Sequence, residues 1–341
     1  MTKVRTVWWA FLYFTFKINR MLQNPSENKN YFTIAFYNLE NLFDTQDDPE
    51  TLDDDFTEGS YKNWNEKRFQ NKVQKLGKVI STIGFDKTKH PPVLIGVAEV
   101  ENSTVLEALV ASKHLQNKNY GFVHFDSPDE RGIDNALLYR KDFFKVSHQE
   151  AHTLYVTNEV GERDYTRDIL HVFGSLQEQP LHILVNHWPS RRQGTQETDY
   201  KRLAAAQKNL EIIHAIQSKD PEARIMVMGD FNDDPLSESL QTLTAKTFYN
   251  PMEVLLTQYQ GSLSHEETWH LFDQILVSHN FLKGHENPFR FESAHIFNPK
   301  QIQEYKEAYK GLPFRTYVGK KYLGGYSDHF PVYGVFSLQM P

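Results

Sequence analysis

The chain contains no cysteine among its 341 residues. This absence excludes disulfide bonds, thiolate-bound zinc and a cysteine nucleophile, and it fits any cellular compartment. An excess of basic residues is absent too: the formal net charge is -7, so the chain is not a generally basic protein that coats nucleic acid. The composition, 39% hydrophobic and 24% charged, is that of a globular protein with enough apolar residues for a sizeable core.

Long hydrophobic runs are also scarce. The apolar run at residues 7–16 is too short to cross a bilayer, although it has about the length of a signal-peptide apolar region. No small-x-small cleavage site follows it, and Met21 offers an alternative start. We therefore treat residues 1–30 as an N-terminal extension, either signal-like or a spurious upstream start, and residues 31–341 as one domain. Without a clear cleavage site, a cytoplasmic location is favoured over export.

Short apolar segments alternate with longer segments of helical periodicity, and the chain shows neither a solenoid repeat nor a low-complexity linker. Strands are predicted at residues 31–37, 93–98, 120–125, 135–139, 169–176, 181–186, 225–229, 274–277 and 332–338. Helices are predicted at residues 66–83, after Asn102 or Ser103, and at 200–217, where Leu203, Ala206, Leu210 and Ile213 would face inward. This order predicts one α/β domain in which helices cover sheets.

The segment at residues 224–235 is the most informative. Its apolar residues 225–229 predict a buried strand that ends abruptly and is followed by Asp230 and Asn232. Residues two apart on an extended segment point the same way, so a carboxylate and an amide would face one point. The alternative is that these side chains only stabilise a turn.

Other predicted strands begin or end in the same manner, with a polar residue. Asn38, Glu99 and His187 follow strands, Asp273 opens one, and Asp328 with His329 precedes the last. Each has a structural alternative, such as a helix cap, a turn or a packed histidine. Together they provide carboxylates, amides and two histidines at strand ends, where ligand sites form in sheet proteins.

This set of side chains suits a hard divalent cation. Mg²⁺, or Mn²⁺ in its place, prefers oxygen ligands, whereas a soft metal would require the thiolates that this chain lacks. The two histidines are better suited to acid, base or charge-stabilising roles than to metal binding. Phosphoester hydrolysis needs such parts: a metal, a base for water and donors for the transition-state charge.

Five segments occur in an order that resembles the endonuclease/exonuclease/phosphatase superfamily, over residues 31–339. A sixth, at residues 272–278, looks like the Asp-Tyr-Ile-like strand of that superfamily. The resemblance implies an α/β fold, a four-layered α/β sandwich. The five segments are Asn38-Leu39-Glu40-Asn41, Ala98-Glu99-Val100, Asn186-His187-Trp188-Pro189-Ser190, Gly229-Asp230-Phe231-Asn232 and Ser327-Asp328-His329.

The resemblance also implies a metal site. Glu99 looks like the principal metal carboxylate, with Asn38 and Asp328 completing or supporting the site. The expected cofactor is therefore Mg²⁺, with Mn²⁺ as a substitute.

The remaining motif residues look like the chemical groups. Asp230 resembles the residue that orients or deprotonates the attacking water, and Asn232 its phosphate-binding neighbour. His329 paired with Asp273 is the alternative base, and His187 resembles the histidine that stabilises the phosphorane or assists the leaving group.

Positions outside the motifs are expected to support the site. Arg167 precedes a strand where the family often has a phosphate-binding arginine, and guanidinium groups suit phosphate. Arg191 and Arg192 directly follow the histidine motif and would hold further phosphates of a polymer. Asp134 is expected to orient His187 through a carboxylate–imidazole hydrogen bond.

Three functions remain open on the sequence. A Mg²⁺-dependent nuclease is favoured, with nucleic acid as substrate. The first alternative is a phosphatase or phosphodiesterase on a lipid head group or inositol phosphate, and the second is a non-catalytic binding module. The acidic loop at residues 44–58 would repel a polyanion if it lay near the cleft. No obligate protein partner is evident.

Overall fold

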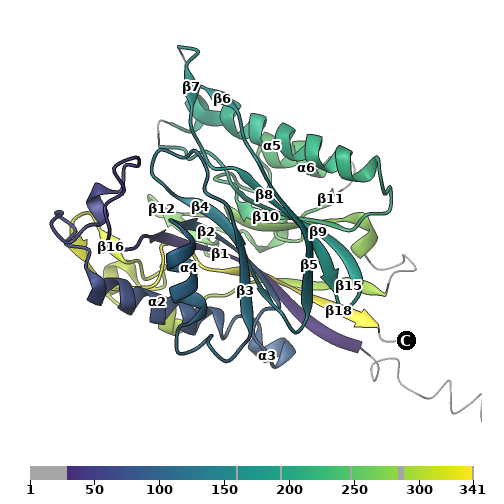
Figure 1. Cartoon of the computed structure of the whole chain (residues 1–341), viewed down its shortest axis with the longest axis horizontal. Helices are drawn as coiled ribbons and strands as arrows, with labels where there is room; N and C mark the ends of the chain where they lie inside the picture. Colours follow the sequence, from purple (N-terminus) through teal and green to yellow (C-terminus); the bar gives the residue numbers. More distant parts are fainter. Residues whose placement is uncertain (1–28, 159, 193, 246–247, 283–287, 340–341) are drawn as a thin grey trace, which may run out of the picture.

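A computed structural model describes residues 29–158, 160–192, 194–245, 248–282 and 288–339 (Figure 1). The predicted N-terminal extension lies outside the described residues up to residue 28, and the first strand, β1 (Lys29–Leu42), includes its last two positions. Two large mixed sheets dominate the described part of the chain, each with antiparallel neighbours around a central parallel pair.

In the first sheet, β1 pairs in parallel with β2 and antiparallel with β18. These central strands are predicted from sequence, because buried apolar residues run along them with few interruptions. The strand order is β15 (Phe289–Ile296), β18 (Val332–Gln339), β1, β2 (Leu94–Val100), β4 (Asp134–Arg140) and β3 (Tyr120–His124).

In the second sheet, β10 pairs in parallel with β9 and antiparallel with β14. The parallel pair brings the carboxyl ends of β9 and β10 to the same edge. The strand order is β11 (Phe248–Tyr249), β14 (Asp273–Ser278), β10 (Ile225–Asp230), β9 (Gln179–His187), β8 (Ile169–Leu176) and β5 (Phe144–His152).

The two sheets pack face to face, and helices cover their outer faces, as Figure 1 shows. Helices α2 (Glu66–Ile80), α3 (Phe85–Thr88) and α4 (Ser103–Val110) lie against the first sheet. Helices α5 (Thr195–Gln217) and α6 (Glu238–Thr244) lie against the second. The predicted four-layered sandwich is therefore present.

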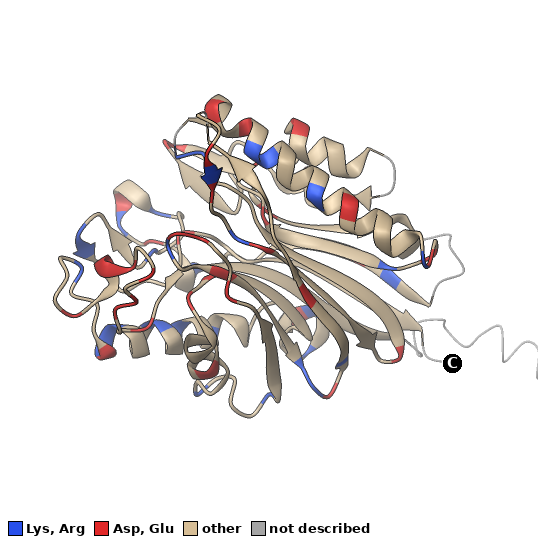
Figure 2. Cartoon of the chain, turned by 45° about the horizontal axis from the view of Figure 1, so that its top comes forward, with Lys and Arg blue, Asp and Glu red and all other residues tan. Residues whose placement is uncertain are grey.

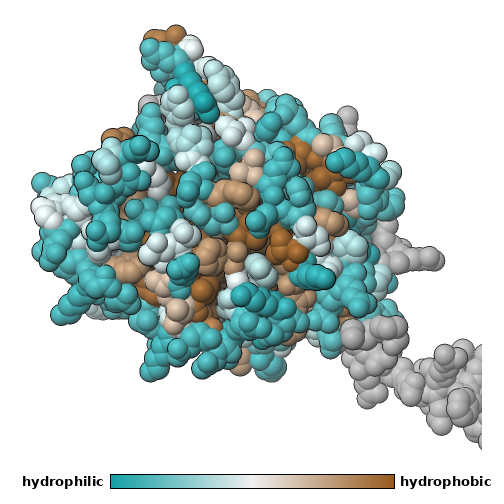
Figure 3. Space-filling model, viewed as in Figure 1, coloured by the Kyte–Doolittle hydropathy of each residue, from teal (hydrophilic) through white to brown (hydrophobic). Residues whose placement is uncertain are grey.

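Charge is distributed according to these layers. Figure 2 shows that the strands carry few charged residues, whereas charged residues gather on helices and on the loops at the strand ends. Hydrophilic residues cover most of the face in Figure 3, with hydrophobic patches between them. Among the described residues, no helix is both long enough and apolar enough to cross a membrane.

Two expectations about elements need correction. The inward face of α5 is only partly the predicted one: Ala206 and Ile213 are buried, but Leu203 and Leu210 are only half-buried. Arg202 and Asn209 are fully buried in their place. Asn209 donates from Nδ2 to Asn186 Oδ1 at 2.8 Å, which explains a polar residue at that position. Strand β5 was not predicted, because many of its residues are charged or histidine. Such residues are typical of an edge strand.

Candidate active site

The predicted site residues lie where the central strands of both sheets end. In β1 and β2, Asn38 is paired with Ala98, the residue before Glu99. In the second sheet, Asp230 lies opposite His187 on one side and opposite Asp273 on the other. The packing of β1 and β2 against β9, β10 and β14 brings these ends together.

Backbone irregularities aim several of these side chains. Glu99 has φ +61° and interrupts the register of β2 between Ala98 and Val100, which makes a bulge. Glu40, Asn41 and Asn232 also have positive φ values of 50–54°. All four residues line one cleft, and left-handed backbone at non-glycine residues is concentrated at functional sites.

Asn232 reaches the cleft by a different route from the predicted one. Strand β10 ends at Asp230, so Asn232 does not share its face by strand alternation. Instead, the backbone N–H of Asn232 donates to Asp230 Oδ1 at 3.0 Å, and its side chain donates to the Trp188 carbonyl at 3.0 Å. The turn therefore also has the structural role that was the alternative explanation.

The cleft has a volume of about 730 Å³ and is lined by side chains of both charges. The predicted residues that line it are Glu99, His187, Arg192, Asp230, Asn232, Asp328 and His329. Asn38 and Asp273 lie behind this lining and contact it through hydrogen bonds. Further lining residues were not predicted: Glu40, Asn41, Asp55, Tyr61, Lys62, Arg131, Ser190, Arg315, Tyr317, Val318, Gly319 and Lys320.

Asn38 connects two carboxylates. Its Nδ2 donates to Asp230 Oδ2 at 2.9 Å and, more weakly, to Glu99 Oε1 at 3.4 Å. Its Oδ1 accepts from the backbone N–H of Glu40 at 2.9 Å. The structure thus places Asn38 as a hydrogen-bond donor between carboxylates, with its oxygen turned away from Glu99.

Asp273 and His329 form a buried pair. Asp273 Oδ2 lies 2.7 Å from His329 Nδ1, and the Asp273 side chain is fully buried. Burial by itself would lower the pKa of His329, but Asp273 and then Asp230 outweigh it and raise that pKa well above 6.5. His329 is therefore an imidazolium at neutral pH.

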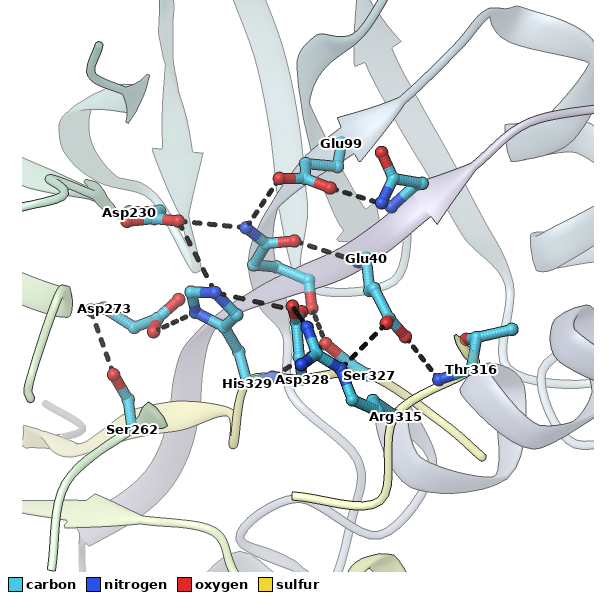
Figure 4. Close-up of polar contacts among 12 residues, drawn as sticks. Glu40, Glu99, Asp230, Ser262, Asp273, Arg315, Thr316, Ser327, Asp328 and His329 are labelled. Atoms are coloured by element: carbon cyan, nitrogen blue, oxygen red, sulfur yellow. Dashed lines mark hydrogen bonds and ion pairs between the residues drawn. The ribbon is translucent and has the colours of Figure 1, made fainter. Parts of the chain in front are cut away.

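The Nε2 atom of His329 faces the cleft. It lies 3.9 Å from Asp230 Oδ2 and 3.9 Å from Asp328 Oδ1. Figure 4 shows the resulting row of contacts, which runs from Asp230 through His329 and Asp328 to Arg315 and Glu40. The cationic ring thus separates two carboxylates that would otherwise repel each other.

The pKa values of Asp230 and His187 are shifted in opposite directions. Burial raises the pKa of Asp230 to about 6, although the charge of His329 acts in the opposite direction. Burial, together with the charges of Arg167 and Arg131, lowers the pKa of His187 well below 6.5. His187 is therefore neutral at pH 7, and its Nε2 lies 3.8 Å from Asp230 Oδ2.

A network of ion pairs that was not predicted supports the same cleft. Arg315 Nη2 lies 2.6 Å from Asp328 Oδ2, and its Nε lies 3.6 Å from Glu40 Oε1. The ammonium group of Lys72 donates to the Glu40 carbonyl and lies 3.7 Å from the Glu40 carboxylate. Positive charges from Arg315 and His329 hold the pKa of Asp328 below its ordinary value, against the effect of burial.

The donor set fits a hard cation, and Glu99 is the carboxylate that most needs one. Its oxygens accept from the Asn41 N–H at 2.8 Å and from Asn38, and no lysine or arginine pairs with it among the described residues. Its nearest basic group, His187 at 4.0 Å, is neutral. A mostly buried carboxylate without a counter-charge is costly unless a cation binds it.

A second set of residues has ligand atoms close enough to bind one metal ion, but its protonation does not suit an ion. Ligand atoms of Asp230, Asp273 and His329 lie within 4.8 Å of one another. The Nδ1 of His329, however, is hydrogen-bonded to Asp273, and the ring is protonated. Only a neutral imidazole nitrogen binds a metal, so this group suits an ion less well than Glu99 does.

Two predicted supporting residues do not lie where their expected roles require. Arg167 does not line the cleft: it is 8% exposed and bonds Asp129 Oδ2 at 3.0 Å and the Trp188 carbonyl at 2.7 Å. Its guanidinium is therefore buried and holds the backbone next to His187. Asp134 bonds His124 Nε2 at 3.0 Å and the Ser127 N–H at 2.9 Å, and His187 Nδ1 has no hydrogen-bond partner among the described residues.

The side chains of the two adjacent arginines lie in different places. Arg191 is turned away from the cleft, because it bonds the Asn232 carbonyl at 2.6 Å and Asp233 Oδ1 at 2.6 Å. Its guanidinium also lies over the Phe272 ring, 4.6 Å from the centroid. Arg192 is exposed and lines the cleft, so only the second arginine of the pair is placed to meet a substrate phosphate.

The acidic loop is divided between two places. Asp55 lines the cleft next to Tyr61 and Lys62, so part of the loop does lie near a substrate. Asp48 and Glu50 line a separate hollow together with Asp126, Asp129 and Glu130. The run of acidic residues in the sequence does not distinguish these two surroundings.

The fold and this site together define a phosphoester hydrolase of the layered α/β class. A family model described as Endonuclease/Exonuclease/phosphatase family matches residues 33–338, and the chain belongs to this family. Members of the family hydrolyse phosphoesters with divalent metal ions, and the chain is a phosphoester hydrolase of this family. No curated protein matches the chain.

Solved structures share the fold at low identity. An endonuclease/exonuclease/phosphatase family protein from Bacteroides thetaiotaomicron is 16% identical, with a TM-score of 0.58 over 92% of this chain and 100% of that one. A mannosyl-6-phosphatase from the same organism is 16% identical, with a TM-score of 0.54 over 89% and 98%. TDP2 from D. rerio, complexed with a single-strand DNA product, is 15% identical, with a TM-score of 0.53 over 90% and 98%.

Proposed function

We propose that the protein is a Mg²⁺-dependent phosphodiesterase that cleaves nucleic acid. The observation that carries the proposal is the set of basic side chains around the catalytic residues. Arg192, Arg131, Lys62, Arg315 and Lys320 line the cleft and come from separate loops of the chain. A polymer with a phosphate at each nucleotide meets such a set of charges at several points.

Glu99 would hold the metal, with Asp328 and Asn38 supporting the site. The bound ion would neutralise nonbridging phosphate oxygens and favour the attack of water. Mg²⁺ suits the oxygen donors of this cleft and commonly keeps several waters when it binds. Mn²⁺ would substitute because it accepts the same ligands.

Asp230 is proposed as the group that takes the proton from water. Its pKa of about 6 leaves it mostly ionised at neutral pH and still basic enough to accept a proton. Asn38 and the Asn232 N–H each bond one of its oxygens, which fixes the carboxylate. The rival base, His329, already carries a proton at neutral pH and so is assigned a different role.

The two histidines would act on the phosphate. His329, as an imidazolium, provides positive charge and a donor at Nε2 for the charge that builds up in the transition state. Asp273 holds its ring from the opposite nitrogen. Neutral His187 offers an uncharged Nε2 donor next to Asp230 and Glu99, and this suits an interaction with a phosphate or leaving-group oxygen.

A second candidate is a phosphatase or phosphodiesterase on a small phosphorylated molecule or lipid head group. It is favoured by contacts between two loops that line the cleft, and we call these loops the wall. Tyr317 donates from its hydroxyl to the Lys62 carbonyl at 3.1 Å, and the Lys320 ammonium lies over the Tyr61 ring. This wall limits the room for a duplex and suits a compact substrate or the end of a strand.

A substrate panel tests the proposal. Purified protein with Mg²⁺ is incubated with single-stranded and duplex DNA, RNA, sphingomyelin, phosphoinositides, a sugar phosphate and a chromogenic phosphodiester. We expect the highest kcat/KM on a nucleic acid. Turnover of a lipid or sugar phosphate while every nucleic acid stays intact would overturn the nuclease assignment and leave the hydrolase assignment standing.

Asp230→Asn is the control for contaminating enzymes. Any activity that this variant retains at the wild-type level does not come from the cleft. All substrates in the panel are therefore measured with both proteins from parallel preparations.

A further inference from the structure

A cluster of histidines lies on the outer face of the second sheet, away from the catalytic cleft. His152 and Glu150 lie on β5, His171 on β8 and His182 on β9, and register places the four on the same face. This is the face that α5 covers, because Ile169 and Leu184 beside the cluster pack with α5. His182 precedes His187 by five residues on β9, a separation of roughly 16 Å along an extended strand.

The ligand atoms in this cluster are close together. Those of Glu150, His152 and His171 lie within 4.8 Å of one another. His152 Nε2 is 3.7 Å from Glu150 Oε2, and His148 Nε2 is 3.5 Å from the same oxygen. Zinc bonds of about 2.1 Å join ligand atoms up to ~4 Å apart, so a small rotation of Glu150, which is half-exposed, closes the remaining gap.

One buried atom in the cluster lacks a partner. His152 Nε2 is inaccessible to solvent and makes no hydrogen bond to any described residue, although it points toward Glu150. A buried polar atom without a partner is costly and calls for an explanation such as a bound ion. The imidazoles also stack, with centroids 5.8 Å apart for His152 and His171, which places neutral rings beside one another.

The neighbouring histidine completes the arrangement. His171 Nε2 lies 3.0 Å from His182 Nδ1, so the Nδ1 of His171 is the nitrogen left to bind an ion. Metal-binding histidines commonly hold their other ring nitrogen in such a hydrogen bond, which fixes the ring. His182 is itself held against the Phe173 ring, with centroids 4.3 Å apart.

We propose that Glu150, His152 and His171 form a binding site for a divalent transition metal such as Zn²⁺, with His182 positioning His171 and the exposed His148 available as a further ligand. Imidazole nitrogens with one carboxylate favour Zn²⁺, Ni²⁺ or Cu²⁺ over Mg²⁺. The bound ion would join the edge strand β5 to β8 and thereby stabilise the sheet. This proposal does not depend on the chemistry of the cleft.

Equilibrium dialysis of the full chain against Zn²⁺ tests the site, with Mg²⁺ in large excess. The variants are His152→Ala and Glu150→Gln, and His265→Ala is the control because His265 is exposed on another hairpin. We expect wild type and the control to bind one more Zn²⁺ than His152→Ala, and Glu150→Gln to weaken that binding by about tenfold or more. Equal binding by wild type and both cluster variants would overturn the proposal.

Thermal unfolding provides a second readout. Zn²⁺ should raise the melting temperature of wild type and of the control, because an ion that binds only the folded state stabilises it. The same Zn²⁺ concentration should shift His152→Ala much less. If His152→Ala does not fold, Glu150→Gln decides the question, because Glu150 is 53% exposed and its replacement leaves the core unchanged. An identical shift in wild type and Glu150→Gln would contradict the proposal.

Discussion

The carboxylate of Asp273 lies 2.7 Å from Nδ1 of His329, and this contact decides which group in the cleft is charged. The carboxylate raises the pKa of His329 well above 6.5 in spite of burial. A cationic ring cannot accept the proton of water, and for this reason we propose Asp230 for that role. Sequence motifs alone left these two assignments open.

Replacing Asp273 by Asn should lower the pKa of His329 toward 6.5, because the charge that holds the proton is removed. Titration of the His329 ring by NMR measures this change directly. Since the folded-state pKa is raised, the pair stabilises the fold fully below pH 6.5, and this contribution fades as the pH rises through the folded-state value. An unchanged ring pKa in Asp273→Asn would show that the carboxylate does not set the charge.

The same pair should act as a unit in catalysis. Asp273→Asn and His329→Ala should each lower kcat by ~10²–10⁴-fold, and the double variant should lose little more than the worse single variant. Steady-state kinetics of the three proteins measure the coupling. A double-variant loss equal to the product of the two single losses would mean that the residues act independently.

Asp230→Asn should lower kcat by ~10²–10⁴-fold and leave the melting temperature nearly unchanged, because the turn around it keeps its backbone hydrogen bonds. In wild type, kcat/KM should fall as the pH drops below about 6, the pKa of Asp230 in the free protein. A pH–rate profile on the preferred substrate measures this decrease in kcat/KM. Activity that stays flat from pH 7 to pH 5 contradicts the assignment of Asp230 as the base.

Removal of divalent metal should abolish activity, since Glu99 lacks a counter-charge among the described residues. A chelator such as EDTA followed by Mg²⁺ or Mn²⁺ should remove and then restore turnover. Glu99→Gln should shift the Mg²⁺ concentration needed for half-maximal rate upward by tenfold or more, because an amide binds the ion less well. Full turnover after exhaustive chelation would exclude the metal mechanism.

The central strands and the motif residues could be predicted from sequence because they obey simple rules. Buried strands such as β10 appear as continuous apolar runs, and the predicted range of β8, residues 169–176, is the observed one. The polar residues at their ends are brought together by parallel pairing, as at Asp230 and His187. The edge strand β5 and the buried polar side of α5 were missed, because their burial depends on tertiary partners.

The supporting residues of the site were the least predictable. Arg167 and Arg191 both look like phosphate ligands in sequence, yet each is already bonded to a carboxylate and a carbonyl. Arg315 lies outside the motifs, 13 residues from Asp328 in the sequence, yet it pairs with Asp328 in the cleft. Whether an arginine is free is a property of its neighbours in space, which a short motif does not encode.

Gly229→Ala should destabilise the fold. A Cβ at this position would lie 2.3 Å from the Asn186 carbonyl oxygen, and backbone atoms cannot move aside cheaply. We expect a loss of about 1–3 kcal/mol in the free energy of unfolding, measured by urea denaturation. Gly59→Ala is the control, because a Cβ there meets nothing within 4 Å. Equal midpoints for the two variants would show that strands β9 and β10 can separate at the site.

The last prediction separates a polymer substrate from a small one. Each phosphate contact that a protein makes on duplex DNA contributes about -0.9 to the slope of log affinity against log salt. Arg192 lines the cleft, whereas Arg191 is bonded to Asp233 and to the Asn232 carbonyl. If DNA is the substrate, Arg192→Ala should flatten the salt dependence of kcat/KM by roughly one unit.

Arg191→Ala should lower stability but keep the wild-type slope, which makes it the matched control. On a small phosphate ester both slopes should be shallow and equal. The assignment fails if Arg192→Ala and wild type show the same slope on DNA, because the cleft would then not meet the polymer through this residue.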